Sequence, residues 1–479
     1  MARTNRIRNW FGLILTILIL SGCAGVNATP TSVPLNPQPG STGLGDSLYP
    51  DFGNGGYDTL HYTLDITVND VATSDLDAVT TIEATATHDL STFNLDFLGF
   101  EITRLTVNDE AAKFARDGQE LTVTPSKPIP NGTAFTIVVE YSGIPDTLMS
   151  QALPFPTGWI VYENGIFVLS EPDGSATFYP VNDHPLDKAT YTFIVTVPKP
   201  FEVAANGVLT ETTESGDSNT YRFELRDPMA SYLTTININD FNTETMKSPS
   251  GIPIRNYYAA SLSDEYREPF ARQGEMLEYF GELFGPYPFD VYGSLVMDTY
   301  FGAALENQTM SIYGMDMVDP NDIEGTEAVV AHELVHQWFG NSVSVADWSD
   351  IWLNEGFATY GEGLWIEHLE GREALEEWFD YLYGEVERYP SFFPPPGNPA
   401  ANDLFNAGVY IRGGLTLHAL RLEVGDEVFF EIIRTYYDRY KDGNAYTEDF
   451  IGVAESVSGE DLSAFFDAWL YDESIPPKP

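Results

Sequence analysis

The stretch AHELVHQWFG, Ala331–Gly340, places two histidines four residues apart and a glutamate directly after the first of them. On a helix these positions lie one turn apart on the same face, so His332 and His336 can reach one metal ion. Glu333 lies one step round the helix, where it flanks that face and can take a proton from an attacking water. The stretch alone leaves two interpretations open, a zinc site or a packed helix that happens to carry two imidazoles.

A third metal ligand follows this stretch. After the turn GNSVSVADWS a second helix is expected in DIWLNEGFATYGEGLWIEHLEG, with Glu355 in its first turns. Two antiparallel helices joined in this way can place Glu355 beside the histidine pair. A His/His/Glu set leaves the fourth tetrahedral position of zinc open for water, which is typical of a catalytic zinc and not of a structural one. We therefore predict one Zn²⁺ ion per chain, bound by His332, His336 and Glu355.

The hydrophobic pattern divides the chain into two parts. From about residue 57 to residue 245 it has period two, as Leu64, Ile66 and Val68 show in YTLDITV, and turn clusters such as PNG and ESGDSN interrupt it. This pattern indicates a largely antiparallel sheet. Near residue 251 the spacing becomes helical and remains mainly so. The sequence predicts an α+β protein, with an N-terminal antiparallel β-domain over residues 55–250 and a mainly helical catalytic domain over residues 251–479.

The N-terminus has the features of an export signal. Three arginines precede the apolar run WFGLILTILIL, which is too short to span a membrane comfortably as a mature helix. Residues 1–22 are therefore predicted to be a signal peptide. Residues 23–54 are rich in Pro, Gly, Ser and Thr and lack periodicity, so they are predicted to be an extended tether.

Cys23 is the only cysteine of the chain, and it follows Leu-Ser-Gly as in the bacterial lipoprotein box, which this segment resembles. The resemblance implies cleavage before Cys23 and attachment of lipid to it. The protein would then belong to the bacterial cell envelope, anchored on the outer side of the cytoplasmic membrane or in an outer membrane where one is present. The alternative is an incidental cysteine in a signal that is simply removed.

The composition is strongly acidic, with 72 Asp and Glu residues against 23 Lys and Arg residues and a formal net charge of −49. Such a field repels phosphate backbones and anionic headgroups, so we expect no nucleic-acid partner and no electrostatic binding to lipid. Contact with the membrane is expected only through the lipid on Cys23. The acidic excess is consistent with a heavily solvated surface, with a calcium site or with a preference for cationic substrates.

HELVH, an interval of 18 residues and the glutamate of NEGFA together resemble the gluzincin aminopeptidases. This is the family of membrane alanyl aminopeptidase (aminopeptidase N) and leukotriene hydrolase. The segments ELFGPYPFDVYGSLV, EPDGSATFYPVNDHPLDKATYTF and VYIRGG are similar to segments of the same family, so the resemblance runs from about residue 55 to the C-terminus. It implies a saddle-like β-domain, a thermolysin-like zinc peptidase domain, and an activity that removes N-terminal residues from peptides.

The resemblance also implies roles for residues outside the metal site. In AALENQTM, Glu306 matches the glutamate that holds the free α-amine of the substrate, and Ala303 and Ala304 belong to the same substrate-binding signature. Glu171 of SEPDG matches a second position that contacts the amine. The chain departs from the family where Ala303 replaces a glycine and Leu305 a methionine, which keeps the carboxylate and changes the wall of the first side-chain pocket.

Tyr410 of VYIRGG matches the family's catalytic tyrosine, whose hydroxyl can donate a hydrogen bond to the tetrahedral oxygen. The predicted function is thus a zinc-dependent aminopeptidase in which Glu333 moves a proton from water to the leaving amine. Three alternatives stay open, namely a zinc endopeptidase, an epoxide hydrolase on the same site, and a non-catalytic surface lipoprotein that only binds. Glu306 argues against the endopeptidase, because it should make a free amine necessary.

The final segment, EDLSAFFDAWLYDESIPPKP, resembles the end of the family's catalytic domain. Many relatives continue from there into a β-sandwich and a large helical domain that covers the active site. We therefore expect a more open cleft in this protein, one that admits longer peptides.

Overall fold

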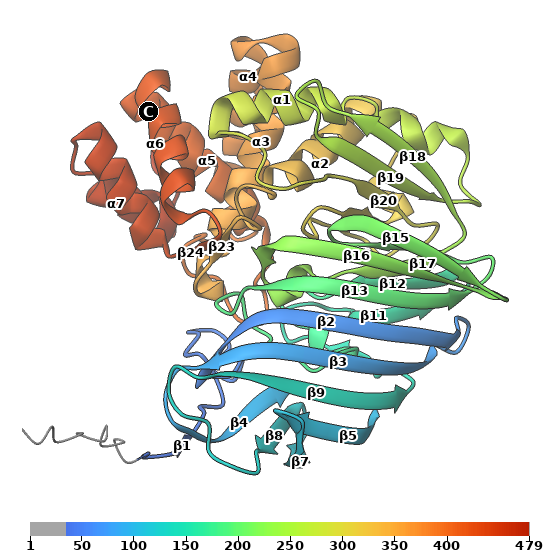
Figure 1. Cartoon of the computed structure of the whole chain (residues 1–479). Helices are drawn as coiled ribbons and strands as arrows, with labels where there is room; N and C mark the ends of the chain where they lie inside the picture. The colour runs from blue at the N-terminus through green and yellow to red at the C-terminus, as the bar shows by residue number, and fades with distance from the viewer. Residues whose placement is uncertain (1–34, 479) are drawn as a thin grey trace, which may run out of the picture. The chain divides into compact units, whose positions relative to one another are not determined.

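Strands dominate the N-terminal half of the computed structural model, which describes residues 35–478 (Figure 1). In β2 the buried residues Leu64, Ile66 and Val68 alternate with more exposed neighbours, as the period-two pattern predicted. Their shared face packs into the main hydrophobic core. β2 belongs to an eight-stranded sheet, in the spatial order β15 (Val208–Ser215), β16 (Ser218–Met229), β13 (Ala189–Pro198), β2 (Tyr57–Asp70), β3 (Asp75–Ala86), β9 (Ala134–Gly143), β5 (Glu101–Val107) and β6 (Glu110–Ala111).

The β-domain has two further sheets, and the large sheet is antiparallel except where β13 pairs with β2. The predicted largely antiparallel β-domain is therefore confirmed. One small sheet has the order β1 (Gln38–Pro39), β4 (Leu90–Asp96), β8 (Glu120–Thr124) and β7 (Lys113–Asp117). The other has the order β10 (Leu148–Met149), β11 (Pro156–Tyr162), β12 (Gly165–Leu169), β17 (Ile236–Asn239) and β14 (Glu202–Ala205).

The C-terminal half combines a five-stranded sheet with helices, as the change of pattern near residue 251 predicted. The sheet has the order β18 (Phe241–Lys247), β19 (Pro253–Ala259), β20 (Ser294–Val296), β22 (Ser311–Tyr313) and β21 (Ala304–Leu305). The longer helices are α1 (Gln273–Phe284), α2 (Ile323–Val335), α3 (Trp352–Glu370), α4 (Arg372–Arg388), α5 (Ala407–Val424), α6 (Asp426–Tyr440) and α7 (Thr447–Ser458), and α8 (Ser463–Phe466) is a single turn.

Local signals set the ends of the helices that frame the site. The Asp322 side chain accepts a hydrogen bond from the backbone N–H of Gly325 and so caps α2. α1 ends before Gly285 and α3 before Gly371, both at positive φ. Between α2 and α3 the chain forms the short strand β23 (Val343–Val345), which pairs with β24 (Gly443–Ala445). The connection therefore turns the chain back along the metal-binding helix.

Residues 37–54, predicted as part of the tether, instead pack against both halves of the protein. The same carboxylate oxygen of the buried Asp46 accepts a hydrogen bond from the backbone N–H of Trp348 at 2.8 Å and lies 3.2 Å from the His184 ring. The Tyr49 hydroxyl donates to the carbonyl of Ala401 at 2.6 Å. Composition suggested an unstructured segment, but a few side chains with buried partners suffice to hold it. Residues 1–34, which include the predicted signal and Cys23, lie outside the described residues.

The boundary between the two halves also differs from the prediction. β18 falls within the range assigned to the β-domain, yet it forms an antiparallel hairpin with β19, from the pair Phe241↔Ala259 to the pair Lys247↔Pro253. β18 therefore belongs to the sheet of the catalytic half, and the boundary lies just after β17. Strand alternation continues through this region, so the sequence pattern shows no change where the chain moves from one sheet to another.

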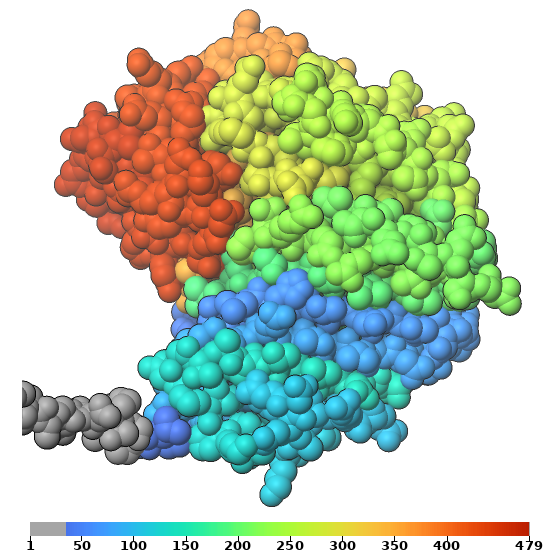
Figure 2. All heavy atoms as spheres, in the orientation of Figure 1, coloured from blue at the N-terminus to red at the C-terminus, as the bar shows by residue number. Residues whose placement is uncertain are grey.

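From Pro37 onward the chain forms one compact unit, and Figure 2 shows its strand-rich part and its helical part in contact along one face. The β-domain reaches the loop after α2, where the Lys188 ammonium donates to the carbonyls of Asn341 and Ser342, each at 2.9 Å. These bonds fix one half against the other beside the predicted metal site. In the part of the chain that is described, no helix combines the length and apolarity needed to cross a bilayer.

Candidate metal centre and active site

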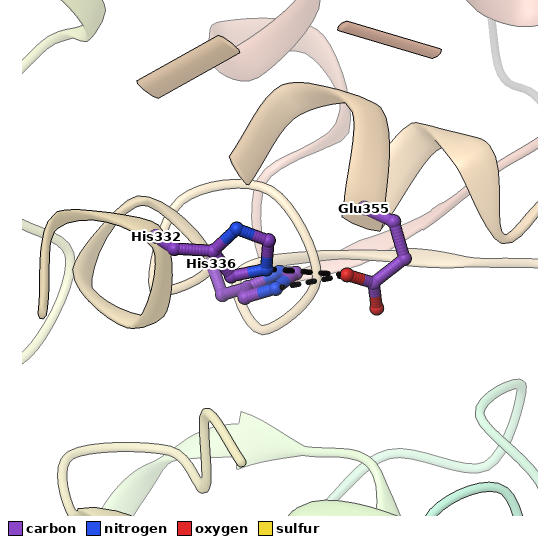
Figure 3. Close-up of side chains that lie close together, drawn as sticks. All are labelled: His332, His336 and Glu355. Carbon is purple, nitrogen blue, oxygen red and sulfur yellow. Dashed lines mark hydrogen bonds and ion pairs between the residues drawn. The ribbon is translucent and has the colours of Figure 1, made fainter. Parts of the chain in front are cut away.

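Two helices supply the three predicted metal ligands (Figure 3). α2 carries His332, and His336 is its C-terminal cap, while Glu355 lies in the first turn of α3. One carboxylate oxygen of Glu355 lies 3.3 Å from Nε2 of His332 and 3.5 Å from Nε2 of His336. Ligand atoms of the three residues all lie within 4.8 Å of one another. The structure thus brings together the two histidines and the glutamate that follows them after an interval of 18 residues.

The donor set fits a zinc ion. Two imidazole nitrogens and one carboxylate oxygen are the ligands of many catalytic zinc sites, and a fourth position remains for water. Burial alone would raise the pKa of Glu355, but the neighbouring His336 and His332 imidazoles lower this pKa to about 2. Glu355 is therefore an anion at neutral pH, as a metal ligand must be.

The ring of each histidine is oriented by an acceptor next to its Nδ1 atom. Nδ1 of His332 lies 2.7 Å from a carboxylate oxygen of Glu362, and Nδ1 of His336 lies 3.2 Å from the carbonyl oxygen of Phe339. These acceptors fix the proton on Nδ1 and leave Nε2 of each ring free for a metal. Sequence analysis missed Glu362. Its position seven residues after Glu355, on the same face of α3, was the available signal.

All nine site residues predicted within the described part of the chain line one cavity of about 300 Å³. They come from both halves of the protein, since Glu171 follows β12 of the β-domain and the other eight lie in the catalytic half. The cavity is also lined by Gly302, Met317, Val329 and Glu362, which were not predicted. The predicted residues are Glu171, Ala303, Ala304, Glu306, His332, Glu333, His336, Glu355 and Tyr410.

Three buried carboxylates of this cavity have oxygens without a hydrogen-bond partner among the described residues. The unpartnered atoms are Oε1 of Glu171, Oε1 of Glu306 and Oε2 of Glu333. Burial raises the pKa of all three groups, that of Glu333 to about 8. Because buried, unpaired anions are costly, the cavity is built to receive positive charge. A metal dication and a substrate ammonium would each provide it.

Glu306 is held by the same segment that carries the histidines. Its backbone carbonyl accepts hydrogen bonds from the side chains of Gln337 at 2.9 Å and Asn341 at 2.7 Å. The Gln337 side chain also accepts a hydrogen bond from the backbone N–H of Thr309 at 2.9 Å. Gln337 directly follows the second histidine, so the predicted amine-binding carboxylate and the metal ligands share one rigid frame. Sequence analysis assigned no role to Gln337 or Asn341.

A close contact between two helices sets the place of Tyr410. A Cβ atom added to Gly356 of α3 would lie 2.8 Å from the carbonyl carbon of Gly413 in α5. Likewise, a Cβ atom added to Gly413 would lie 2.8 Å from the Cα of Gly356. Only glycine permits this approach. Tyr410 lies one turn before Gly413, with its ring centroid 6.0 Å from that of His332. Burial raises the pKa of Tyr410 well above its usual value, so its hydroxyl stays protonated and can donate a hydrogen bond.

A second cavity, of about 210 Å³, opens beside the first. The two share Glu171, Tyr410 and the segment from Gly302 to Ala304. The remaining residues that line the second cavity are all apolar, namely Leu153, Phe155, Leu169, Leu305 and Phe405. An apolar side chain held next to the carboxylates would therefore find a pocket of matching chemistry.

Known domains match both halves of the chain. Residues 58–233 match the Peptidase M1 N-terminal domain, and residues 269–469 match the Peptidase family M1 domain. Aminopeptidase M1 of Arabidopsis thaliana is 26% identical over 326 residues, which make up 64% of this chain and 36% of that protein. Aminopeptidase N of Streptomyces lividans is 29% identical over 312 residues, 60% of this chain and 36% of that protein. The matched part thus spans about a third of the length of these curated relatives.

Solved structures match over nearly their whole length. The crystal structure of an M1 zinc metallopeptidase from Deinococcus radiodurans has a TM-score of 0.83 and 32% identity, and covers 91% of this chain and 98% of that chain. A Glu-to-Ala mutant from the same organism, bound to a Tyr-Ser-Ala substrate, has a TM-score of 0.83 and 31% identity, with coverage of 91% and 99%. A two-domain M1 zinc metallopeptidase mutant bound to L-tryptophan has the same scores.

Proposed function

This chain belongs to the M1 family of zinc metallopeptidases, and on that premise we propose that it is an aminopeptidase that removes apolar residues from the N-termini of peptides. One observation carries the proposal. The cavity that holds the His/His/Glu set also contains two further buried glutamates, Glu171 and Glu306, each with an unpartnered oxygen. The protonated α-amine of a peptide can supply the missing donors, and it would then lie one residue from the scissile carbonyl.

The residues divide the chemistry as follows. His332, His336 and Glu355 would hold the zinc ion, which supplies Lewis acidity toward the scissile carbonyl and a more acidic water. Glu333 accepts the proton of the attacking water and delivers it to the leaving amine. Its place in the same cavity as the two imidazoles, with one carboxylate oxygen free of any partner among the described residues, suits both steps.

Two further contacts act on the substrate itself. The Tyr410 hydroxyl donates to the oxygen on which negative charge develops. Glu306 and Glu171 hold the free N-terminus through charge-assisted hydrogen bonds, and thereby set which peptide bond faces the base. The relatives whose structures contain a Tyr-Ser-Ala substrate, L-tryptophan or L-arginine support a site for the amine, since all three ligands have a free α-amine.

The second cavity supports the choice of substrate. Leucine, phenylalanine or methionine at the N-terminus would bury its side chain against Leu169, Leu305 and Phe405, a favourable contribution of about 1.5–3 kcal/mol for full burial. An acidic side chain would be repelled by the carboxylates at the mouth of the cavity. A basic one would bring charge into an apolar wall and leave it without a partner there.

The test compares Leu-anilide with N-acetyl-Leu-anilide, and then Leu-, Phe-, Lys- and Glu-anilides with one another. We expect hydrolysis of the free amine only, with kcat/KM highest for Leu and Phe. Equal rates for the acetylated compound would refute the aminopeptidase and favour the endopeptidase alternative. A preference for Glu or Lys would leave the aminopeptidase standing but refute the assignment of the apolar cavity.

We further propose that the protein is a lipoprotein of the bacterial cell envelope, with lipid on Cys23. The observation behind this proposal is the sequence pattern of a charged start, an apolar run and Leu-Ser-Gly before a unique cysteine. We expect Cys23→Ser to move the protein from the membrane fraction to the soluble fraction. Unchanged partitioning of the variant would refute lipidation at this residue.

A further inference from the structure

Arg255 lies on β19, where the catalytic sheet meets the β-domain. Its Nη2 donates to the carbonyl of Ala205 at 2.7 Å, and its guanidinium carbon lies 5.2 Å from the ring centroid of Phe223. The residue is 8% exposed. Its side chain is therefore buried at the junction of the two halves, and it forms no ion pair with any acid among the residues that the structure describes.

Three arginines are buried among the described residues, and their partners differ. Arg421 is paired with Glu367 at 2.6 Å and with Asp426 at 2.9 Å. Arg412 donates to three backbone carbonyls. Arg255 has the single hydrogen bond to Ala205, and its Nε and Nη1 have no partner among the described residues. A buried guanidinium with two idle nitrogens is costly, and the cation–π contact with Phe223 offsets only part of that cost.

Arg255 also lines a cavity of about 490 Å³ between two sheet edges. Residues of β15 form one side and residues of β18 and β19 the other, and Figure 1 shows these strands next to one another. The walls are largely apolar and include Val208, Leu209, Ile254 and Tyr257. A volume of this size is typical of small-molecule sites.

The charge of this cavity is opposite to that of the protein. The described residues that line it include two cations, Arg255 and Lys247, and no aspartate or glutamate. In a chain with 72 acidic and only 23 basic residues, such a composition marks the cavity as a place for an anion. Because no carboxylate is available there for an ammonium group, a free amino acid would leave its amine unpaired.

We propose that this cavity binds an organic monocarboxylate with an apolar body, and that Arg255 takes the carboxylate. The guanidinium is planar, and its idle Nη1 stands at the outer end beside Nη2, so Nη1 can donate a charge-assisted hydrogen bond to a carboxylate oxygen. The apolar body would pack against Leu209, Ile254 and Tyr257. A fatty acid of medium length and the C-terminus of an apolar peptide share this chemistry.

The cavity is separate from the active site. A small hydrophobic cluster lies between them, in which Tyr257, a wall of the new cavity, packs together with Leu169 and Leu305, which are walls of the apolar cavity beside the zinc site. The carboxylate site is therefore distinct from the site that would hold the substrate's N-terminus.

The experiment is calorimetric titration of the full chain with octanoate, and with octanamide as the neutral control. A second arm uses N-acetyl-Ala-Leu-Leu and its C-terminal amide, in which the acetyl group removes the amine that the active site would bind. We expect octanoate or the free-acid peptide to bind and the matched amides to bind about tenfold more weakly or worse, given the strength of charged hydrogen bonds. The arm that binds more tightly identifies the source of the carboxylate.

Variants assign the binding to the cavity. Arg255→Met should weaken carboxylate binding by about tenfold or more. Thr245→Glu, at an exposed position of the cavity wall, should weaken it by repulsion without touching the arginine. Arg226→Met removes a nearby arginine whose side chain is 73% exposed, and should leave binding unchanged. Hydrolysis of Leu-anilide by each variant reports that the fold is intact.

Two results would overturn the proposal. One is equal binding of the acids and their amides to the unaltered chain. The other is tight carboxylate binding that survives both Arg255→Met and Thr245→Glu. If Arg255→Met fails to fold, Thr245→Glu alone decides, because its change lies at an exposed position.

Discussion

Two groups of buried carboxylates in this molecule have opposite surroundings. In the β-domain, Asp96 accepts from the Asn54 side chain at 3.1 Å and the backbone N–H of Asp183 at 2.9 Å, and Asp183 accepts from the Ser231 hydroxyl at 2.7 Å. In the active-site cavity, Glu171, Glu306 and Glu333 each keep an oxygen without a partner. Burial raises the pKa in both groups. Asp96 and Asp183 therefore receive hydrogen-bond donors from the chain itself, whereas the three glutamates of the cavity each keep an oxygen for a donor from outside.

The difference teaches how to recognise function in a strongly acidic protein. Burial and a raised pKa occur in both regions, so neither property identifies the active site. An unpartnered oxygen alone does not identify it either, since Asp173 and Glu120 of the β-domain also have one. Three such carboxylates in one cavity do, because buried carboxylates without donors favour a ligand that supplies them. The same argument, with the charge reversed, applies to Arg255.

The largest effect is expected for Glu333→Gln, which removes the proton acceptor and keeps the shape of the side chain. We expect kcat on Leu-anilide to fall by about a thousandfold, within the range typical of general-base catalysis. Bound zinc should stay near one equivalent per chain, because Glu333 is not among the three ligands. Assays of turnover and of metal content check this. Turnover that persists in the variant would show that Glu333 is not the base.

Glu306→Gln tests whether the unpartnered acids receive an ammonium. We expect kcat/KM for Leu-anilide to fall by about 10- to 100-fold, as for the loss of one charged hydrogen bond. Glu171→Gln should lower it less, because Glu306, whose backbone Gln337 and Asn341 fix beside the metal ligands, still holds the amine. The control is Asp117→Asn, an exposed carboxylate in β7 that should leave the rates unchanged. Equal rates for the Glu306 variant and the unaltered chain would show that this unpartnered glutamate does not bind the substrate amine.

The frame around the functional acids can be tested without a change to any carboxylate. Gly413→Ala places a methyl group against the backbone of Gly356, so α5 must move away from α3 and carry Tyr410 with it. We expect kcat to fall on the order of tenfold, since small displacements of catalytic groups are costly. Overpacking should lower the free energy of unfolding by about 1–3 kcal/mol. Kinetics and denaturant unfolding measure the two effects. An unaltered kcat would mean that the glycine contact does not position Tyr410.

The smallest effect concerns stability and the β-domain acids. Burial raises the pKa of Asp96 and of Asp183 from 3.8 to about 7. A group whose pKa is raised by folding stabilises the protein below its unfolded pKa, and this contribution is lost as pH rises toward the folded pKa. We therefore expect the free energy of unfolding to decrease between about pH 4 and pH 7, by about 1.4 kcal/mol per pH unit for each such group that titrates alone.

Asp183→Asn checks whether the buried β-domain acids cause this pH dependence of the free energy of unfolding. The variant should lose less stability between pH 5 and pH 8 than the unaltered chain, and Asp117→Asn should behave like the unaltered chain. Urea unfolding at the two pH values provides the measurement. An identical slope in the Asp183 variant would place the pH dependence elsewhere.

Sequence analysis found the metal ligands because their pattern is local. His332 and His336 are fixed by helical spacing, and Glu355 follows after a short connection. It found the strands of the β-domain for the same reason, since alternation is set by each strand alone. It misjudged residues 37–54, where single side chains such as those of Asp46 and Tyr49 find partners about 300 and 352 residues away. It also assigned β18 to the β-domain, because the alternation of buried and exposed residues along a strand is the same in either sheet.

The sequence by itself determined which residue types can bind zinc, move a proton and hold an amine, and how they are spaced within single elements. Only the tertiary structure decided which further residues line the cavity that Glu171, Glu306 and Tyr410 share, that Glu362 supports His332, and which buried acids lack a partner. The reason is physical. Spacing within a helix or strand follows from backbone geometry, whereas contacts across hundreds of residues depend on how whole sheets and helices pack and on which polar groups that packing leaves unpaired.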